Sequence, residues 1–328
     1  MNPFSFDGVW VKGNLHSHTN NSDGVLSPSE VVKYYCRNGF DFLALTDHDK
    51  ITRIDSNCLI LFSGIEVTVK NSVSYHVVGI DVDDENYILK LKDDSIQSLL
   101  NYISERGLAI IAHPYWSNLT INDLLILRNY VGIEIYNAGC DVEVAKGYSI
   151  AHWDCIISKD TGVYGFAVDD AHWYNGFDAP GGWILVKVRD KSRDEIITSI
   201  KEGKFYSTMG PLISEFKSVG NIVNASFTPV NRVDIVSENG SGFSFSMNTY
   251  HLIKSGIVGI RNFKKVKLSS NGDIEKLTIE IGNGVIEVYL SSKGIIGILI
   301  EGFKFKNYLR LEITDFNGRK AWSNPVKI

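Results

Sequence analysis

Two histidines near the start of the chain have a spacing that suits metal binding. His16 and His18 are separated by one residue, and Asp23 follows five residues after His18. Residues 9–11 read as a strand, and residues i and i+2 of a strand point to the same side. Two imidazoles on one side can bind one metal ion, and the loop that follows can return Asp23 to it. The alternative is two histidines held by local hydrogen bonds at a strand end.

Further histidines and carboxylates follow other short apolar segments. With the first three, the candidate metal ligands are His16, His18, Asp23, His48, Glu66, His76, His113, Asp170 and His172. Zinc usually takes four ligands, so this set predicts a site for two or three ions. Glu66 is the natural bridge, because a carboxylate can offer one oxygen to each of two metals. Each residue alone could be a strand-end cap or a turn residue, but that does not explain why they recur at the same end of successive strands.

The elements that must position these residues alternate between strands and helices. We expect strands at residues 40–45, 59–65, 75–80, 108–112, 131–136, 163–168 and 183–188. Helices are expected at 27–38, 95–106, 120–128, 142–157 and 192–202, the first and last opening with capping boxes. This alternation implies a parallel sheet, and polar residues at strand carboxyl ends are typical of a barrel. A hairpin turning at residues 70–73 would bring Glu66 close to His76.

The pattern changes after residue 210. Helical periodicity disappears, and short alternating strands follow, with turn signals at residues 271–272, 282–284 and 317–318. Such strands predict a β-sandwich. We therefore expect an α/β barrel over residues 1–210 and a small all-β sandwich domain over residues 211–328.

Composition narrows the classes of function. The net charge is −5 and no basic block is present, which argues against nucleic acid as a partner. No apolar run approaches the ~18 residues of a membrane helix, and the first residues do not resemble a signal peptide. The cysteines are widely spaced, which suggests reduced thiols in a cytoplasmic protein; they are Cys36, Cys58, Cys140 and Cys155.

The candidate ligands lie in segments that resemble the PHP (polymerase and histidinol phosphatase) domain superfamily of metal-dependent hydrolases. The matching segments are residues 16–18, 22–24, 46–48, 64–66, 76, 112–114 and 170–172. The resemblance covers residues 9–210 and fills all nine ligand positions of the family. It implies a distorted (βα)7 barrel, a trinuclear metal site and, in most members, phosphoester hydrolysis.

A narrower resemblance, to the CehA/McbA-type branch, includes the tail of the chain. It rests on residues 168–172, 182–183, 203–211 and 321–325. That branch includes hydrolases of aryl carbamates. The nucleotide-phosphoesterase branch carries a helical insertion between the positions of His76 and His113, which are only 37 residues apart here. The resemblance therefore also argues against an RNA-exonuclease activity.

We expect a metal-dependent hydrolase, foremost a phosphoesterase, in which a hydroxide bridging zinc, manganese or iron ions attacks the substrate. Glu66 and Asp47 are the candidate catalytic residues, Asp47 as a proton shuttle or an orienting group. Asn137, Tyr115 and Trp173 are candidate substrate contacts, with helix capping as the alternative for Asn137; Trp116 is a further candidate for the pocket wall. The alternatives are a carbamate, amide or ester hydrolase with the same metals, and a non-catalytic metal-stabilised binding module.

The expected partner is a small-molecule phosphoester or an aryl ester or carbamate, with no membrane and with a homodimer left open.

Overall fold

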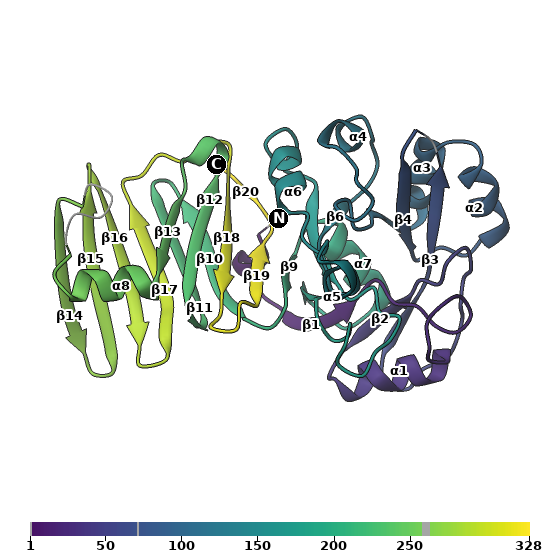
Figure 1. Cartoon of the computed structure of the whole chain (residues 1–328), viewed down its shortest axis with the longest axis horizontal. Helices are drawn as coiled ribbons and strands as arrows, with labels where there is room; N and C mark the ends of the chain where they lie inside the picture. The colour runs from purple at the N-terminus through teal and green to yellow at the C-terminus, as the bar shows by residue number, and fades with distance from the viewer. Residues whose placement is uncertain (1, 71, 258–262) are drawn as a thin grey trace. The chain divides into compact units, whose positions relative to one another are not determined.

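The chain folds into two compact units. The computed structural model describes residues 2–70, 72–257 and 263–328. The first unit contains residues 7–207, and the second contains residues 2–6 and 208–328 (Figure 1). Within the described residues, no helix combines the length and the apolar character that crossing a membrane requires.

The first unit is built on a mixed sheet with the strand order β9-β8-β1-β2-β3-β4-β5-β6-β7. Its strands are β1 (Val9–Asn14), β2 (Phe42–Leu45), β3 (Ile60–Lys70), β4 (Ser74–Ile80), β5 (Leu108–Ile111), β6 (Gly132–Asn137), β7 (Tyr164–Val168), β8 (Trp183–Val188) and β9 (Phe205–Thr208). The pairs β1–β2, β2–β3, β5–β6 and β6–β7 are parallel. The pairs β3–β4, β4–β5 and β1–β8 are antiparallel, so the sheet is not parallel throughout.

The predicted hairpin is confirmed by β3 and β4. Their antiparallel pairing places Thr68 opposite His76 and Glu66 opposite Val78. The predicted turn at residues 70–73 includes Asn71, which lies outside the described residues. The hairpin matters because it carries two of the candidate ligands to one end of the sheet.

Helices of the first unit are α1 (Pro28–Arg37), α2 (Glu85–Lys92), α3 (Ile96–Arg106), α4 (Ile121–Leu125), α5 (Ala138–Val144), α6 (Ile150–Ile157) and α7 (Arg193–Lys201). The capping box of Ser27 and Glu30 is present at α1. Helix α2, capped by Asp84, was not predicted. Residues 142–157 were expected to be mostly helical, and residues 142–144 and 150–157 are. Ala145 is left-handed (φ 57°), and the Asn137 N–H donates to Gly147 O, 3.0 Å away, so the chain breaks between α5 and α6.

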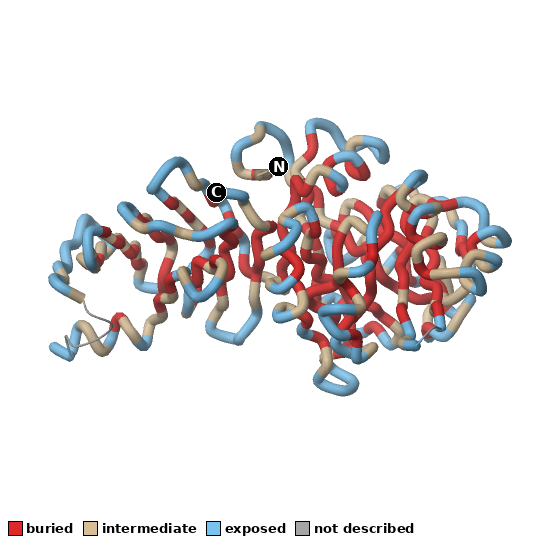
Figure 2. The backbone as a smooth tube through the Cα atoms, turned by 90° about the horizontal axis from the view of Figure 1, so that it is seen from above, coloured by how far each residue is buried: buried red, intermediate tan, exposed pale blue. Residues whose placement is uncertain are grey.

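The core of the first unit lies on its strands. Val11, Phe42, Phe62, Ile110 and Phe166 belong to one buried cluster. Every residue of β2 and of β5 is buried, as expected for strands covered on both faces. Figure 2 shows this continuous buried interior, with exposed backbone mainly in connecting loops and helices.

The segments that follow β1 and β7 are held side by side. Ser17 and Ala171 form a parallel bridge. The Asp170 N–H donates to His16 O, and the His18 N–H donates to Ala171 O; each N···O distance is 3.0 Å. These bonds join the carboxyl ends of the first and seventh strands, where five candidate ligands lie.

The second unit consists mainly of two antiparallel sheets. One has the order β10 (Ile213–Val219), β11 (Ile222–Val230), β17 (Gly294–Glu301), β16 (Gly284–Ser291), β15 (Ile274–Ile281) and β14 (Lys265–Asn271). The other contains β12 (Arg232–Ser237), β13 (Phe243–Ser246), β18 (Tyr308–Thr314), β19 (Lys320–Ser323) and β20 (Val326–Lys327). The predicted turns are confirmed, with positive φ at Gly272, Gly282 and Gly318. Helix α8 (Met247–Lys254) and the short 3-10 helices η1 (Pro3–Ser5) and η2 (Glu238–Gly240) were not predicted.

The expectation of four reduced thiols was wrong for one pair. Cys36 and Cys58 are joined in a disulfide, whereas Cys140 is buried and free and Cys155 is exposed and free.

Candidate metal centre

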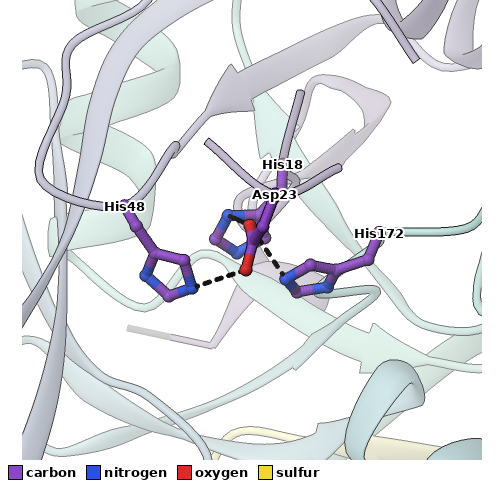
Figure 3. Close-up of side chains that lie close together, drawn as sticks. All are labelled: His18, Asp23, His48 and His172. Atoms are coloured by element: carbon purple, nitrogen blue, oxygen red, sulfur yellow. Dashed lines mark ion pairs between the residues drawn. The ribbon is translucent and has the colours of Figure 1, made fainter. Parts of the chain in front are cut away.

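The structure brings all nine candidate ligands into one cluster: seven follow the carboxyl ends of β1, β2, β5 and β7, whereas Glu66 lies within β3 and His76 near the start of β4. Their donor atoms form groups in which all atoms lie within 4.8 Å of one another. The first group consists of His18, Asp23, His48 and His172. Figure 3 shows the Asp23 carboxylate between the imidazoles of His48 and His172. Asp23 Oδ2 lies 3.4 Å from His48 Nε2, and Asp23 Oδ1 lies 3.4 Å from His172 Nε2.

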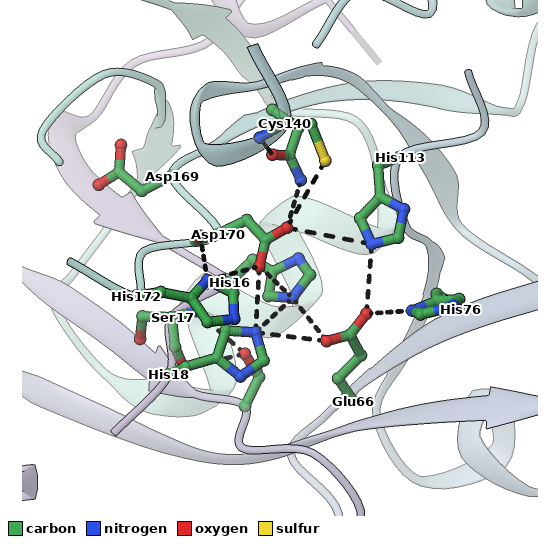
Figure 4. A network of polar contacts seen from close by, with 12 residues as sticks. His16, Ser17, His18, Glu66, His76, His113, Cys140, Asp169, Asp170 and His172 are labelled. Atoms are coloured by element: carbon green, nitrogen blue, oxygen red, sulfur yellow. Dashed lines mark hydrogen bonds and ion pairs between the residues drawn. The ribbon is translucent and has the colours of Figure 1, made fainter. Parts of the chain in front are cut away.

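The second group is fully buried and consists of His16, His18, Glu66 and Asp170. Asp170 Oδ1 lies 3.1 Å from His16 Nε2 and 3.0 Å from His18 Nε2. Glu66 Oε2 lies 3.2 Å and 3.3 Å from the same two nitrogens. The two imidazole nitrogens are themselves 3.1 Å apart (Figure 4). Two histidines thus face the same pair of carboxylate oxygens.

The third group consists of Glu66, His76 and His113. Glu66 Oε1 lies 2.9 Å from His76 Nδ1 and 3.3 Å from His113 Nε2. The other oxygen, Oε2, faces His16, His18 and, at 3.1 Å, His48 Nδ1. Each oxygen of Glu66 therefore faces a different set of histidines, as a bridging carboxylate would.

The histidines and carboxylates of the cluster strongly shift one another's pKa values. Burial opposes ionisation of Glu66, but His16, His113 and His18 hold the pKa of this carboxyl well below its usual range. Burial alone would lower the pKa of His18, yet its hydrogen bonds with Asp170 and Glu66 raise it to about 9. Without an ion, His16 and His18 therefore favour their protonated forms beside the carboxylates, whereas burial lowers the pKa of His48. A divalent cation would take the place of those protons.

Glu134 is a functional candidate that the sequence reasoning missed. It lies on β6, is 1% exposed, and places Oε1 2.6 Å from His16 Nδ1. Its other oxygen accepts 2.8 Å hydrogen bonds from the His113 N–H and from Asn137 Nδ2. Glu134 therefore orients His16, with Nε2 directed at the cluster, as carboxylates behind metal-bound histidines do. The available signal was a charged residue inside an otherwise apolar strand.

Asp47 holds a loop and is in none of the donor groups. Its Oδ1 accepts 2.7 Å hydrogen bonds from the Thr19 N–H and the Ser22 hydroxyl. Its Oδ2 accepts a hydrogen bond of 2.8 Å from the Thr19 hydroxyl and another from the Thr52 hydroxyl. The structure thus shows Asp47 positioning the segment that carries Asp23, and its role as a proton shuttle stays a prediction.

Asn137 occupies the helix-cap position that was the alternative for it. Its Oδ1 accepts from the Cys140 N–H over 2.9 Å at the start of α5. Its Nδ2 donates to Glu134 Oε2 at a distance of 2.8 Å and to Asp170 Oδ2 at a distance of 3.0 Å. The side chain is fully buried, so the structure supports capping and orientation of Asp170 rather than a substrate contact.

A cavity of about 400 Å³ opens onto the cluster. Seven of the nine candidate ligands line it, and the other lining residues are Trp116, Gly139, Cys140, Glu143 and Trp173. Trp173 thus lies where a substrate contact was predicted. Tyr115 is 43% exposed but is not among the lining residues, so the structure does not bring it to the cavity. Cys140 lies in a further donor group with His113 and Asp170, and it was not predicted as a ligand.

The donor set fits divalent metal ions. Six imidazoles and three carboxylates converge, and no Arg or Lys is among the described residues that line the cavity. Imidazole and carboxylate oxygen together suit zinc, manganese or iron. Buried His, Glu and Asp clusters of this kind fit divalent metal binding.

The chain is similar in structure to a solved two-domain protein from Bacteroides vulgatus, described as containing a predicted PHP-like metal-dependent phosphoesterase. The alignment covers 98% of this chain and 95% of that protein. The TM-score is 0.55 at 14% sequence identity. The chain has a PHP-like fold.

Two curated proteins match a shorter part of the sequence. A 5'-3' exoribonuclease from Haemophilus influenzae is 38% identical over 80 residues, which are 22% of this chain and 29% of that protein. A 5'-3' exoribonuclease from Salmonella typhimurium is 35% identical over 79 residues, 21% of this chain and 27% of that protein. The matches thus span less than a third of either relative. No protein-family model matches the chain.

These comparisons bear out the prediction of a hydrolytic enzyme. They also overturn one expectation: nucleic acid was not expected as a partner, yet the matched relatives are named exoribonucleases. The physical reason is that a net charge of −5 is a sum over the whole chain. Phosphate at a metal centre is attracted by the bound cations, which that sum leaves out.

Proposed function

We propose that the chain is a metal-dependent phosphoesterase. Its multinuclear metal centre would contain three ions, held by the nine candidate ligands. The observation that carries the proposal is Glu66, whose two oxygens face separate histidine sets. His18 belongs to both the first and the second donor group, and Glu66 belongs to both the second and the third, which supports adjacent ions rather than isolated sites. A (βα)7 barrel, a β-sandwich in the second unit and membership of the CehA/McbA-type branch belong to the same proposal.

Bound divalent ions would supply hydroxide at neutral pH and stabilise the negative charge that develops on the attacked group. The chain's own residues fix the geometry for this step. Glu66 stays ionised through its histidine neighbours and is 1% exposed, so its position does not depend on solvent. Glu134 fixes the ring of His16, and Asn137 fixes one oxygen of Asp170. Asp23 is the half-exposed member, and it lies where substrate enters.

The proposed substrates are phosphoesters of nucleotides or nucleic acid. Support comes from the two exoribonuclease relatives and from the cluster's capacity to hold cations against a phosphate. The lack of Arg and Lys among the lining residues means that the ions, not side chains, must hold the phosphate. The same lack favours a second candidate, hydrolysis of an aryl carbamate or ester, because a neutral substrate needs no cationic side chain.

Two matched substrates separate these candidates. Manganese- or zinc-loaded protein is given a phosphodiester and a carbamate that share one aryl leaving group. We expect metal-dependent turnover of the phosphodiester. Turnover of the carbamate alone would refute the phosphoesterase proposal and support the second candidate.

A further inference from the structure

Two tryptophans line the cavity without belonging to the metal centre. Trp116 is 40% exposed and Trp173 is 52% exposed. A single exposed indole needs no explanation, since much of any protein surface is apolar. Two indoles in the same cavity, next to a cluster of nine polar ligands, leave a large aromatic area open to whatever enters.

The two rings lie beside different parts of the cluster. Trp116 contacts the rings of His76 and His113 at centroid distances of 5.6 Å and 5.0 Å. Both contacts are close to perpendicular, at 72° and 71°, so neither imidazole stacks parallel to the indole. Trp173 follows His172 directly in the chain, and His172 belongs to the donor group around Asp23. A ligand at the metal centre therefore meets an indole beside each of two donor groups.

The orientation of Trp173 is fixed by a polar contact. Its indole N–H donates to Glu143 Oε1 over 2.8 Å, and Glu143 also lines the cavity. An indole held in this way has already lost rotational freedom before a ligand arrives. Stacking on it therefore costs less ordering entropy than stacking on a free side chain.

We infer that Trp116 and Trp173 are specificity-determining residues that stack against the base of a nucleotide unit whose phosphate lies at the metal centre. This inference rests on the proposed phosphoesterase function. Every base has an aromatic face, so such stacking selects nucleotides with little preference among the four bases. Without an Arg or Lys among the lining residues, stacking is the main interaction that the cavity offers to the rest of the nucleotide.

Removing one stacking ring is expected to weaken nucleotide binding by about 5- to 150-fold, the range measured for base–aromatic contacts in other proteins. The probes are adenosine 5'-monophosphate and ribose 5-phosphate, which differ only in the base. Binding to manganese-loaded protein is measured by calorimetry. The variants are Trp116→Leu and Trp173→Leu, with Phe177→Leu as control because Phe177 is 53% exposed and is not among the lining residues.

We expect the wild type and Phe177→Leu to bind the adenine nucleotide more tightly than ribose 5-phosphate. Each tryptophan variant should show a preference smaller by about that factor and keep its affinity for ribose 5-phosphate. Equal binding of the two probes by the wild type, no binding of the nucleotide, or tryptophan variants that behave like Phe177→Leu would overturn the inference.

This test is independent of turnover. Metal-dependent phosphodiester hydrolysis by a protein that binds adenosine 5'-monophosphate and ribose 5-phosphate equally would overturn the stacking inference alone. Tighter binding of adenosine 5'-monophosphate by a protein that hydrolyses no phosphoester would support stacking and refute the phosphoesterase proposal.

Discussion

Replacing Glu134 by glutamine tests whether a carboxylate outside the donor groups controls the metal centre. Glu134 Oε1 lies 2.6 Å from His16 Nδ1, and the residue is 1% exposed. Glutamine keeps the size of the side chain but removes its charge. Partners of metal-bound histidines typically contribute about 10- to 100-fold to metal affinity, so Glu134→Gln should weaken manganese binding by about that factor.

The same variant should lower the pKa of His16 in the metal-free protein. Burial acts to lower that pKa, but Asp170 and Glu134 raise it well above the ordinary histidine value. Removing the Glu134 charge takes away one of the raising contributions. An NMR titration of the histidine rings measures the change, and a purely structural role for Glu134 would leave it unmoved.

Manganese affinity is measured by competition with a chelator. Glu105→Gln is the matched control, because Glu105 is 72% exposed and forms an ion pair with neighbouring Arg106. Glu134→Ala serves as a second comparison: it leaves the His113 N–H and Asn137 Nδ2 without their 2.8 Å acceptor, at about 1–3 kcal/mol each. Unchanged manganese affinity and unchanged His16 pKa in a folded Glu134→Gln protein would refute the reasoning.

Three further predictions concern the loop, the charge balance and the packing of the centre. Asp47→Asn should loosen the loop that carries Asp23 and weaken metal binding about tenfold, as measured by competition with a chelator. Loss of turnover at unchanged metal affinity would instead indicate that Asp47 transfers a proton. Asp170 and Glu66 favour the protonated form of His18 only in the folded state, where its pKa is about 9, compared with about 6.5 in the unfolded chain. Metal-free protein should therefore lose stability to urea as the pH rises from about 6.5 to about 9. Metal-loaded protein should show no such loss. Gly139→Ala should weaken metal binding, since its Cβ would lie 2.6 Å from Asp170 O, whereas Gly162→Ala, which meets only Asp160 Oδ1 at 3.1 Å, should not.

The cluster could be predicted from sequence because seven of its nine members follow the carboxyl ends of strands. His16 and His18 illustrate the point: their two-residue spacing after β1 places both Nε2 atoms 3.1 Å apart. Glu66 and His76 were found through the hairpin of β3 and β4, which the pairing confirms. These inferences need only local geometry and the direction of strands.

Roles that depend on distant packing could not be predicted. Glu134 is separated from His16 by 118 positions, and a lone glutamate in a strand gives no indication of that partner. Asp47 lies next to His48, so it looked catalytic, but its bonds run to the loop at Thr19 and Ser22. The break between α5 and α6 could not be predicted from periodicity, because it depends on backbone hydrogen bonds that link Asn137 to Gly147 and Ser149 to Ile135.

Net charge misled the prediction about partners. A whole-chain charge of −5 says little about a cavity whose donor groups fit divalent cations. The spacing of 37 residues between His76 and His113 was also read as evidence against nucleotides. That interval contains α2 and α3, and sequence matches to exoribonucleases outweigh an argument from a missing insertion.

The most direct test of the account is a manganese titration of metal-free wild type and Glu66→Gln, with bound ions counted and phosphodiester hydrolysis followed together. Wild-type activity should appear only as more than one ion binds per chain. Glu66→Gln should bind fewer ions and show no turnover, because one neutral amide cannot replace a carboxylate whose oxygens face two histidine sets. Full activity in Glu66→Gln, or in wild type freed of metal, would contradict the central claim.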